Sequence, residues 1–208
     1  MPDHTRIFTD YFNRQFWGNA SGSSGPNSAY ELTPVLRQNL QQLLHDYQIK
    51  HIVDAGCGDA NLIRYLDLTG ITYIGVECVA DLTTLNQQRF TDQPNMSFQT
   101  LDIVTEILPD TQLVICRDVV HYLPNELLWQ FLENLLKSPF KYLLVTHNTH
   151  APLSANTTTD VGIFRPVNLS QAPFHLPEPL TTIKEDVFAK EMALWSRTAI
   201  EEALKKHA

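Results

Sequence analysis

The sequence predicts an α/β protein built on one mostly parallel sheet with helices on both faces. Short apolar stretches alternate with amphipathic helical patterns along most of the chain, which is the arrangement that βαβ units produce. Three of the apolar stretches end in an acidic residue, namely Asp54, Glu77 and Asp102. Because the carboxyl ends of parallel strands meet at one edge of a sheet, we expect these side chains to share a site.

Seven strands are expected in all. Five belong to the alternating part of the chain, and two apolar stretches near the C-terminus predict a closing antiparallel pair. The alternative for the second of these is a single helix over residues 189–206, and we favour a strand followed by a short tail helix. The expected strands cover residues 51–54, 71–77, 96–101, 112–116, 142–146, 180–184 and 192–197.

Helices are expected between the strands. Thr33 is suited to cap a helix that starts at Pro34 and runs to about residue 47, with Val35 among its inward-facing residues. Further helices are predicted over about 60–67 and 80–90, from Pro124 onward, and in the C-terminal tail.

The first 33 residues predict a cap that precedes the main domain, residues 34–208. Aromatic residues recur there at roughly helical intervals, namely Phe8, Tyr11, Phe12, Phe16 and Trp17. Residues 18–28 follow and are rich in glycine, serine and asparagine. Such a loop is either a flexible linker or a lid over a ligand, and the flanking aromatics favour the lid.

The composition narrows the functional classes. The chain has 208 residues and a formal net charge of −8, which disfavours a nucleic-acid partner. No apolar run is long enough to cross a membrane, and no signal peptide is visible, so neither a membrane partner nor export is expected. The three cysteines, Cys57, Cys78 and Cys116, have no metal-ligand spacing and cannot all pair. Reduced thiols and a cytoplasmic location are therefore expected.

A glycine-rich turn between the first strand and the next helical pattern is the most informative motif. Asp54 precedes two glycines, Gly56 and Gly58, and Ala60 follows them. Such a strand–turn–helix unit forms the nucleotide cradle of open α/β sheets. A P-loop is excluded, because no Gly-Lys-Ser/Thr follows, and a dinucleotide fingerprint would place glycine where this chain has Asn61.

This pattern resembles motif I of the class I S-adenosylmethionine-dependent methyltransferases. The resemblance implies a Rossmann-like seven-stranded sheet, S-adenosyl-L-methionine as cofactor and S-adenosyl-L-homocysteine as product. One group of these enzymes also shares the Trp-Gly and Ser-Gly segments of residues 17–28, the sequence Arg-Asp-Val-Val-His-Tyr at 117–122, and the stretch 162–174. The N-terminal loop departs from that group at Asn27, where glycine is usual.

The resemblance implies a set of cofactor contacts. Glu77 is expected to bind the ribose hydroxyls and Asp102 the adenine amino group, although a turn aspartate is the simpler alternative for the latter. The full expected set is Trp17, Asp54, Gly56, Cys57, Gly58, Glu77, Cys78, Asp102, Ile103 and Arg117.

The polar cluster after the fourth strand is the expected catalytic region. His121 is predicted to act as a base that Asp118 orients, because a histidine pKa lies near neutrality. The alternative is a structural ion pair between Arg117 and Asp118, with His121 packed beside the cofactor. Residues expected to bind the acceptor are Tyr122, His147 and Arg165, and no metal is expected.

The predicted function is methyl transfer from S-adenosyl-L-methionine to an oxygen or nitrogen of a small-molecule acceptor. Since the methyl donor is already activated, such an enzyme mainly aligns two partners and excludes water. The alternatives are a protein or RNA methyltransferase, an NAD-linked oxidoreductase, and a binding module without activity. The sequence leaves the oligomeric state open.

Overall fold

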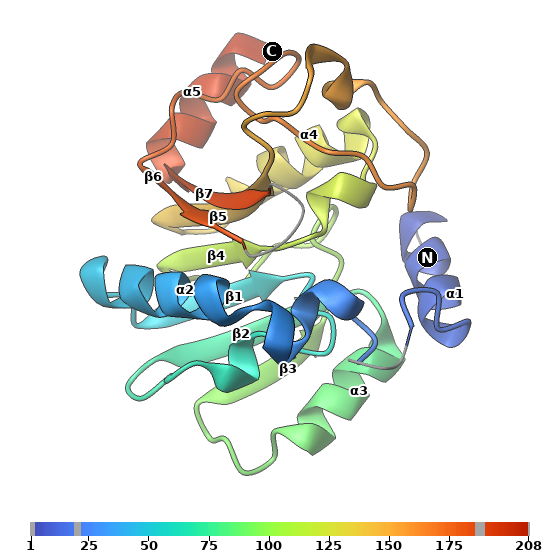
Figure 1. Ribbon diagram of the computed structural model, residues 1–208, viewed down its shortest axis with the longest axis vertical. Helices are drawn as coiled ribbons and strands as arrows, with labels where there is room; N and C mark the ends of the chain where they lie inside the picture. Colours follow the sequence, from blue (N-terminus) through green and yellow to red (C-terminus); the bar gives the residue numbers. More distant parts are fainter. Residues whose placement is uncertain (1–2, 19–21, 186–189, 208) are drawn as a thin grey trace.

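A seven-stranded sheet runs through the centre of the computed structural model, which describes residues 3–18, 22–185 and 190–207 (Figure 1). The strand order is β3-β2-β1-β4-β5-β7-β6, and β7 alone runs antiparallel to its neighbours. The sheet therefore confirms the prediction of seven mostly parallel strands. Their bounds are β1 His51–Ala55, β2 Thr72–Glu77, β3 Met96–Thr100, β4 Leu113–Cys116, β5 Tyr142–His147, β6 Thr181–Lys184 and β7 Glu191–Ser196.

Five α-helices accompany the sheet in the part of the chain that is described. They are α1 Asp3–Asn13, α2 Pro34–Asp46, α3 Ala80–Arg89, α4 Asn125–Leu135 and α5 Arg197–His207. No helix in residues 3–18, 22–185 or 190–207 is both long and apolar enough to cross a membrane.

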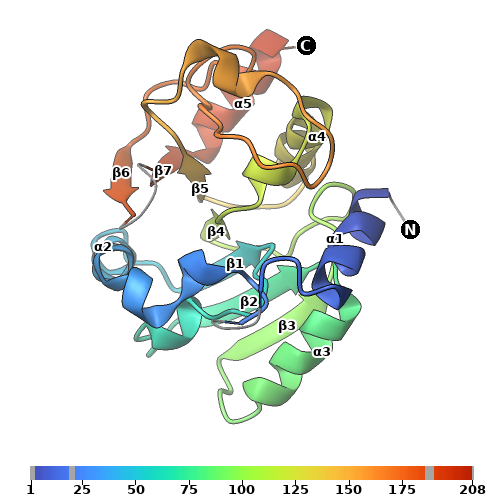
Figure 2. The same cartoon turned by 45° about the vertical axis from the view of Figure 1, so that its right-hand side comes forward.

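Two hydrophobic cores lie on opposite faces of the sheet. Successive side chains of a strand point to opposite faces, and the buried residues of β4 alternate accordingly between the cores. Val114 packs in the core that contains α4 and α5, whereas Leu113 and Ile115 pack in the core that contains α2. Helices thus cover both faces, as the views in Figures 1 and 2 also show.

The prediction of a helix over residues 60–67 is wrong. The chain forms only a short 3₁₀ turn, Ile63–Tyr65. Ala60 has a left-handed φ of 54°, and Leu66 is already extended with ψ of 150°, so the helical conformation has room for about one turn. The apolar spacing reflects the burial of Leu62 and Ile63 instead.

Two details at the start of α2 also differ from the prediction. The Thr33 side chain does not cap the helix; its hydroxyl donates a hydrogen bond back to the Ala29 carbonyl oxygen at 2.9 Å. Val35 is 45% exposed, because it lies on the outer side of the first turn. The helix is held by the inward row of Leu36, Leu40, Leu43 and Leu44, all buried.

Candidate functional site

A crevice of about 260 Å³ opens at the carboxyl ends of β1, β2 and β4. It lies where the strand order reverses between β1 and β4, which is the position where open α/β sheets bind ligands. The N-terminal segment covers it: α1 and the following loop contribute His4, Phe8 and Trp17 to its wall.

The structure brings together all of the predicted cofactor residues in the lining of this crevice. They are Trp17, Asp54, Gly56, Cys57, Gly58, Glu77, Cys78, Asp102, Ile103 and Arg117. Asp118 and Tyr122 line it as well, whereas His121, His147 and Arg165 do not.

The glycine turn needs residues without a side chain. Gly56 has φ of 78° and Gly58 φ of 55°, in the left-handed region that favours glycine. A Cβ atom on Gly56 would lie 2.5 Å from Cγ2 of Val119, and one on Gly58 would collide with the Ser24 hydroxyl. The two glycines therefore allow the turn to pass close beneath its neighbours.

Glu77 joins the end of β2 to this turn. Its Oε2 accepts a hydrogen bond from the Gly58 N–H at 3.1 Å, and its Oε1 accepts one from the Val79 N–H at 3.1 Å. Burial raises the pKa of Glu77 above its ordinary value, against these hydrogen bonds. The carboxylate is thus fixed in the wall of the crevice between two backbone donors.

Asp54 lies deeper, at the end of β1. Its Oδ2 accepts a hydrogen bond from the Tyr73 hydroxyl at 2.8 Å. Burial raises the pKa of Asp54 to about 7, since the charged form is poorly solvated there. Asp54, the acid of the glycine motif, is therefore partly protonated near neutral pH.

Asp102 is held by its own turn and by the N-terminal helix. Its Oδ1 accepts a hydrogen bond from the Val104 N–H at 3.0 Å, and its Oδ2 accepts one from the Thr105 hydroxyl at 2.7 Å. His4 Nε2 lies 2.9 Å from the same Oδ2. The turn-aspartate alternative is present in this geometry, and the carboxylate also faces the crevice.

Residues 22–28, called the strap from here on, lie directly over the glycine turn. The Asp59 carboxylate accepts a hydrogen bond from the Ser23 N–H at 2.9 Å, and the Ser24 hydroxyl accepts one from the Asp59 N–H at 2.8 Å. Asn61 donates from Nδ2 to the Ser28 carbonyl oxygen at 2.8 Å. The strap is therefore an ordered part of the site over the residues described, residue 22 onward.

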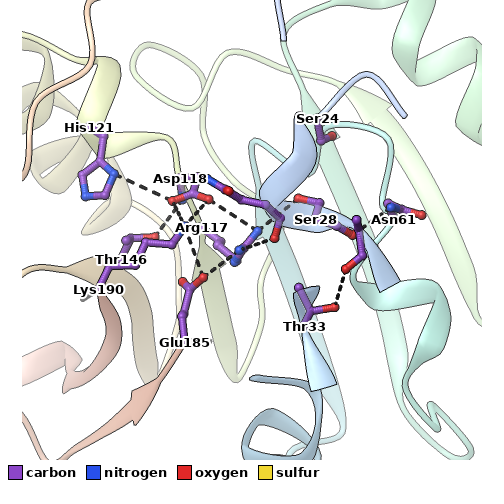
Figure 3. Close-up of polar contacts among 12 residues, drawn as sticks. Ser24, Ser28, Thr33, Asn61, Arg117, Asp118, His121, Thr146, Glu185 and Lys190 are labelled. Atoms are coloured by element: carbon purple, nitrogen blue, oxygen red, sulfur yellow. Dashed lines mark hydrogen bonds and ion pairs between the residues drawn. The ribbon is translucent and has the colours of Figure 1, made fainter. Parts of the chain in front are cut away.

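A buried charge network lies next to the strap. Figure 3 shows that its Arg117 contacts both Ser28 of the strap and Glu185. Arg117 Nη2 donates to the Asn27 carbonyl oxygen at 2.9 Å and to Glu185 Oε2 at 2.7 Å. Lys190 Nζ lies 2.6 and 2.5 Å from the two oxygens of Asp118, and 3.2 Å from Glu185 Oε2. Two cations and two anions thus balance in a buried place, which such a cluster requires.

Asp118 is the acid of this network that lines the crevice, next to Arg117. Its φ is 58°, which is unusual for a residue with a side chain, and its N–H donates to the Thr146 hydroxyl at 2.7 Å. The cations Arg117 and Lys190 hold the pKa of Asp118 below its ordinary value despite burial. Asp118 is therefore a fixed anion, and a poor acceptor of protons at neutral pH.

His121 lies behind Asp118, away from the crevice. Its ring is 0% exposed, and its Nδ1 is 3.7 Å from Asp118 Oδ1, too far for a hydrogen bond. Asn148 Oδ1 accepts from the Val167 N–H, so it also accepts from His121 Nε2, 2.9 Å away, and the proton of the ring sits on Nε2. Burial lowers the pKa of His121 to about 4. Direct contact of His121 with an acceptor, which the sequence predicted, does not fit this geometry.

His147 and Arg165 are also structural rather than exposed to the crevice. His147 Nδ1 accepts a hydrogen bond from the Leu169 N–H at 3.2 Å, and burial lowers the pKa of this ring to about 4. Arg165 Nη2 donates to Asn125 Oδ1 at 2.7 Å and to a backbone oxygen of Leu123 at 3.1 Å. Both residues tie the long segment after β5 to the rest of the domain, and acceptor binding by either is not what the structure offers.

Several residues that line the crevice or belong to its charge network are not in the predicted set. His4, Phe8 and Phe12 line the crevice from a helix whose place over the sheet depends on long-range packing. Asp59 follows the glycines directly, so its place in the motif was a usable signal. No local signal marks Lys190 as the partner of Asp118, because 72 residues separate them.

Two expectations concern thiols and metals. The three cysteines are free, and burial raises the pKa of Cys57 and Cys78, which line the crevice. Within the described parts of the chain, no group of three side chains has the arrangement of a metal site.

The fold and the crevice define the class: a Rossmann-like α/β protein with a crevice at its topological switch point. Residues 53–138 match the family model described as a methyltransferase domain. This match covers the glycine turn, Glu77, Asp102 and the cluster after β4. A comparison with curated proteins finds no match.

Solved methyltransferases share the fold. Magnesium protoporphyrin IX methyltransferase (ChlM) from Synechocystis PCC 6803, with bound SAH, is 17% identical over 94% of this chain and 100% of that chain, with a TM-score of 0.66. Phosphoethanolamine N-methyltransferase 1 from Haemonchus contortus, in complex with phosphoethanolamine and S-adenosylhomocysteine, is 14% identical over 99% of this chain and 53% of that chain, with a TM-score of 0.65. Human N-acetylserotonin methyltransferase, in complex with SAM, is 15% identical over 78% and 54%, with a TM-score of 0.54.

At these identities the structures establish the fold. The matched methyltransferase domain covers residues 53–138, which is less than half of the chain.

Proposed function

We propose that this protein transfers a methyl group from S-adenosyl-L-methionine to an oxygen or nitrogen of a small-molecule acceptor. The observation that supports this most directly is the charge of the crevice. Its lining includes five carboxyl groups, of which Asp54 is partly protonated, against one arginine among the described residues. The carboxyl groups belong to Asp54, Asp59, Glu77, Asp102 and Asp118, and the arginine is Arg117. An anionic wall favours a ligand that carries a sulfonium cation and disfavours the pyrophosphate of a dinucleotide.

The local backbone supports the same choice. Dinucleotide sites place the pyrophosphate at the N-terminus of a helix that follows the glycine turn. Here the turn is followed by a single 3₁₀ turn, Ile63–Tyr65, and the first α-helix after it is α3, beyond β2. The crevice therefore lacks the helix dipole and the neutral surroundings that NAD binding requires.

The residues of the crevice fit the proposed cofactor. The Glu77 carboxylate is fixed between two backbone donors at the end of β2, where it would accept hydrogen bonds from ribose hydroxyls. Asp102 faces the same space at the next strand and would accept from an adenine amino group. When bound, the cofactor would supply an activated methyl group to the lone pair of the acceptor.

The chain's own contribution is alignment. Asp118 is a rigid, ionised carboxylate in the crevice, so we propose that it accepts a hydrogen bond from the N–H or O–H of the acceptor and orients it. His121 supports the turn that contains Asp118, and we propose a positioning role for it in place of a base. The strap and the N-terminal helix exclude water from the site.

Isothermal calorimetry with S-adenosylhomocysteine tests the cofactor. Binding is expected for the parent protein, and Glu77→Gln is expected to weaken it by roughly tenfold or more, since hydrogen bonds to a charged group contribute about 1.5–3 kcal/mol. Glu126→Gln, on an exposed position of α4, is the matched control and should bind normally. Binding of NAD⁺ without binding of S-adenosylhomocysteine would contradict the proposal.

A second experiment concerns the acceptor. The protein is incubated with methyl-labelled S-adenosylmethionine and a cell extract divided into small-molecule, protein and RNA fractions. Label is expected in the small-molecule fraction. Label confined to protein or RNA would refute the small-molecule assignment while leaving the methyltransferase assignment in place.

A further inference from the structure

Five aromatic side chains form a continuous row at the mouth of the crevice. Phe16 stacks on Tyr11 with ring centroids 4.4 Å apart, and Tyr11 meets Trp17 edge-on at 5.3 Å. Trp17 meets Tyr122 at 5.7 Å, and Tyr122 meets Phe164 at 5.8 Å, both edge-on. We call these five residues the aromatic row.

The row connects three segments that are far apart in sequence. Phe16, Tyr11 and Trp17 belong to the N-terminal segment, Tyr122 follows β4, and Phe164 lies in the long connection after β5. The Tyr11 ring packs so closely on Gly162 that a Cβ atom there would lie 2.8 Å from it. Figures 1 and 2 both show the connection after β5 passing beside α1.

The middle of the row is in the crevice and its ends are in solvent. Trp17 and Tyr122 line the crevice. Phe16 is 61% exposed and Phe164 is 58% exposed, and the neighbouring Ile163 is 52% exposed. Large apolar side chains that are exposed together and continuous with a ligand site mark a surface that a ligand covers.

The charges of the lining limit what that ligand is. Among the described residues of the lining, Arg117 is the sole lysine or arginine, and Asp118 and Glu185 already neutralise it. An acceptor with a phosphate or carboxylate group would find no free cation there. The charge of the Asp118 carboxylate is already balanced by Arg117 and Lys190, so this group favours a neutral hydrogen-bond donor.

We propose that the acceptor has a flat, uncharged aromatic ring that docks against Trp17, Tyr122 and Phe164, with its hydroxyl or amino group directed toward Asp118. This deepens the methyltransferase assignment and rests on it for the identity of the acceptor site. Edge-to-face and offset-stacked contacts between rings add to the burial of apolar area, which explains why a flat ring fits this wall better than a puckered one.

Calorimetry with two probes of equal carbon skeleton tests the ring preference. The probes are 2-naphthol and trans-decahydro-2-naphthol, each titrated into the protein with and without saturating S-adenosylhomocysteine. The naphthol is expected to bind at least threefold more tightly than its saturated counterpart. Equal affinity of the two probes would overturn the proposal, and so would an absence of binding by both.

Two variants test whether 2-naphthol binds at the aromatic row. Phe164→Leu keeps an apolar side chain of similar size and is expected to weaken 2-naphthol binding roughly three- to tenfold. Tyr65→Leu removes an exposed aromatic ring outside the row and should leave it unchanged. An unchanged affinity in Phe164→Leu overturns the assignment of the row, even if the naphthol binds elsewhere.

Two further outcomes are distinguished by the molecular mass in solution and by the cofactor titration. They are a dimer that covers the aromatic row and a failure of the methyltransferase assignment. If light scattering shows a dimer that Phe164→Leu dissociates, the row is an interface between copies of the chain and the proposal fails. Failure of the methyltransferase assignment is observed separately, as the absence of S-adenosylhomocysteine binding. The titration of naphthol without S-adenosylhomocysteine still tests binding at the aromatic row.

Discussion

The Asp59 carboxylate accepts a hydrogen bond from the Ser23 backbone N–H at 2.9 Å, across 36 residues of sequence. This contact fastens the strap to the turn that follows β1. Asp59 is 1% exposed, and its other oxygen accepts from the Asn61 N–H at 3.1 Å. One carboxylate therefore shapes the glycine turn and holds the cover above it, so opening the strap and deforming the turn are coupled.

Asp59→Asn is predicted to loosen the strap. Asparagine offers one acceptor oxygen where two are used, so one hydrogen bond is lost, worth about 1 kcal/mol. Hydrogen exchange of the Ser23 amide should become roughly fivefold faster, and S-adenosylhomocysteine should dissociate faster. Asp81→Asn, an exposed residue of α3, is the control. Unchanged exchange at Ser23 would show that the strap is held without Asp59.

Lys190→Met is predicted to destabilise the fold by about 3–5 kcal/mol, because it leaves two buried carboxylates, Asp118 and Glu185, with a single cation. Urea denaturation measures the free energy of unfolding. Lys184→Met removes an exposed lysine on β6 and should change this energy by less than about 0.5 kcal/mol. The double variant Lys190→Met with Asp118→Asn should lose less than the sum of the single variants. Additive losses would argue against direct coupling of the pair.

His147 is predicted to make the fold sensitive to acid. The folded protein lowers its pKa to about 4 from the ordinary 6.5, so its contribution to stability is complete above pH 6.5 and is lost as pH falls toward 4. His147→Asn keeps an acceptor for the Leu169 N–H and removes this titration. The variant should therefore lose less stability than the parent between pH 6.5 and 4, by roughly 2 kcal/mol. His121 titrates in the same window, and its share remains in both proteins. Parallel pH profiles would contradict the assignment.

Asp54 is predicted to make the fold less stable as pH rises, which is opposite to the effect of His147. Its pKa is raised to about 7 from 3.8, so its stabilising effect is complete below pH 3.8 and is lost as pH rises through 7. Asp54→Asn keeps an oxygen for the Tyr73 hydroxyl and removes the titration. The stability of the variant relative to the parent should rise between pH 4 and pH 7, by an amount of the order of 4 kcal/mol. Denaturant titrations at four pH values measure this, and a constant difference would refute the raised pKa.

The strands were predictable because their signal is local. Apolar runs of four to six residues that end in an acid mark β1 and β2, and the structure confirms them within one residue. The helix over residues 60–67 failed for a local reason that the apolar pattern does not contain. The left-handed φ of Ala60 shortens the helix, and the pattern of buried residues is the same with or without it.

The grouping of the residues proposed for the cofactor was predictable for a related reason. The glycine turn and Asp102 each follow a strand and Glu77 ends one, and a parallel sheet brings such positions to one edge whatever the loops do. The places of the residues predicted for the acceptor were not predictable in this way. His121, His147 and Arg165 are polar residues near that edge, and in the structure all three are buried away from the crevice in hydrogen bonds with backbone or amide groups.

The amino-acid sequence by itself determined the order of strands and helices, the glycine turn and the acids at the carboxyl ends of β1, β2 and β3, since these depend on neighbours within a few residues. Only the tertiary structure decided that the strap fastens to Asp59, that Lys190 faces Asp118, and that aromatic rings from three segments form one row. Those relationships join residues 36 to 151 positions apart, as in Ser23 with Asp59 and Tyr11 with Gly162. They exist because packing around the sheet brings these segments together, and no local preference of the chain encodes that.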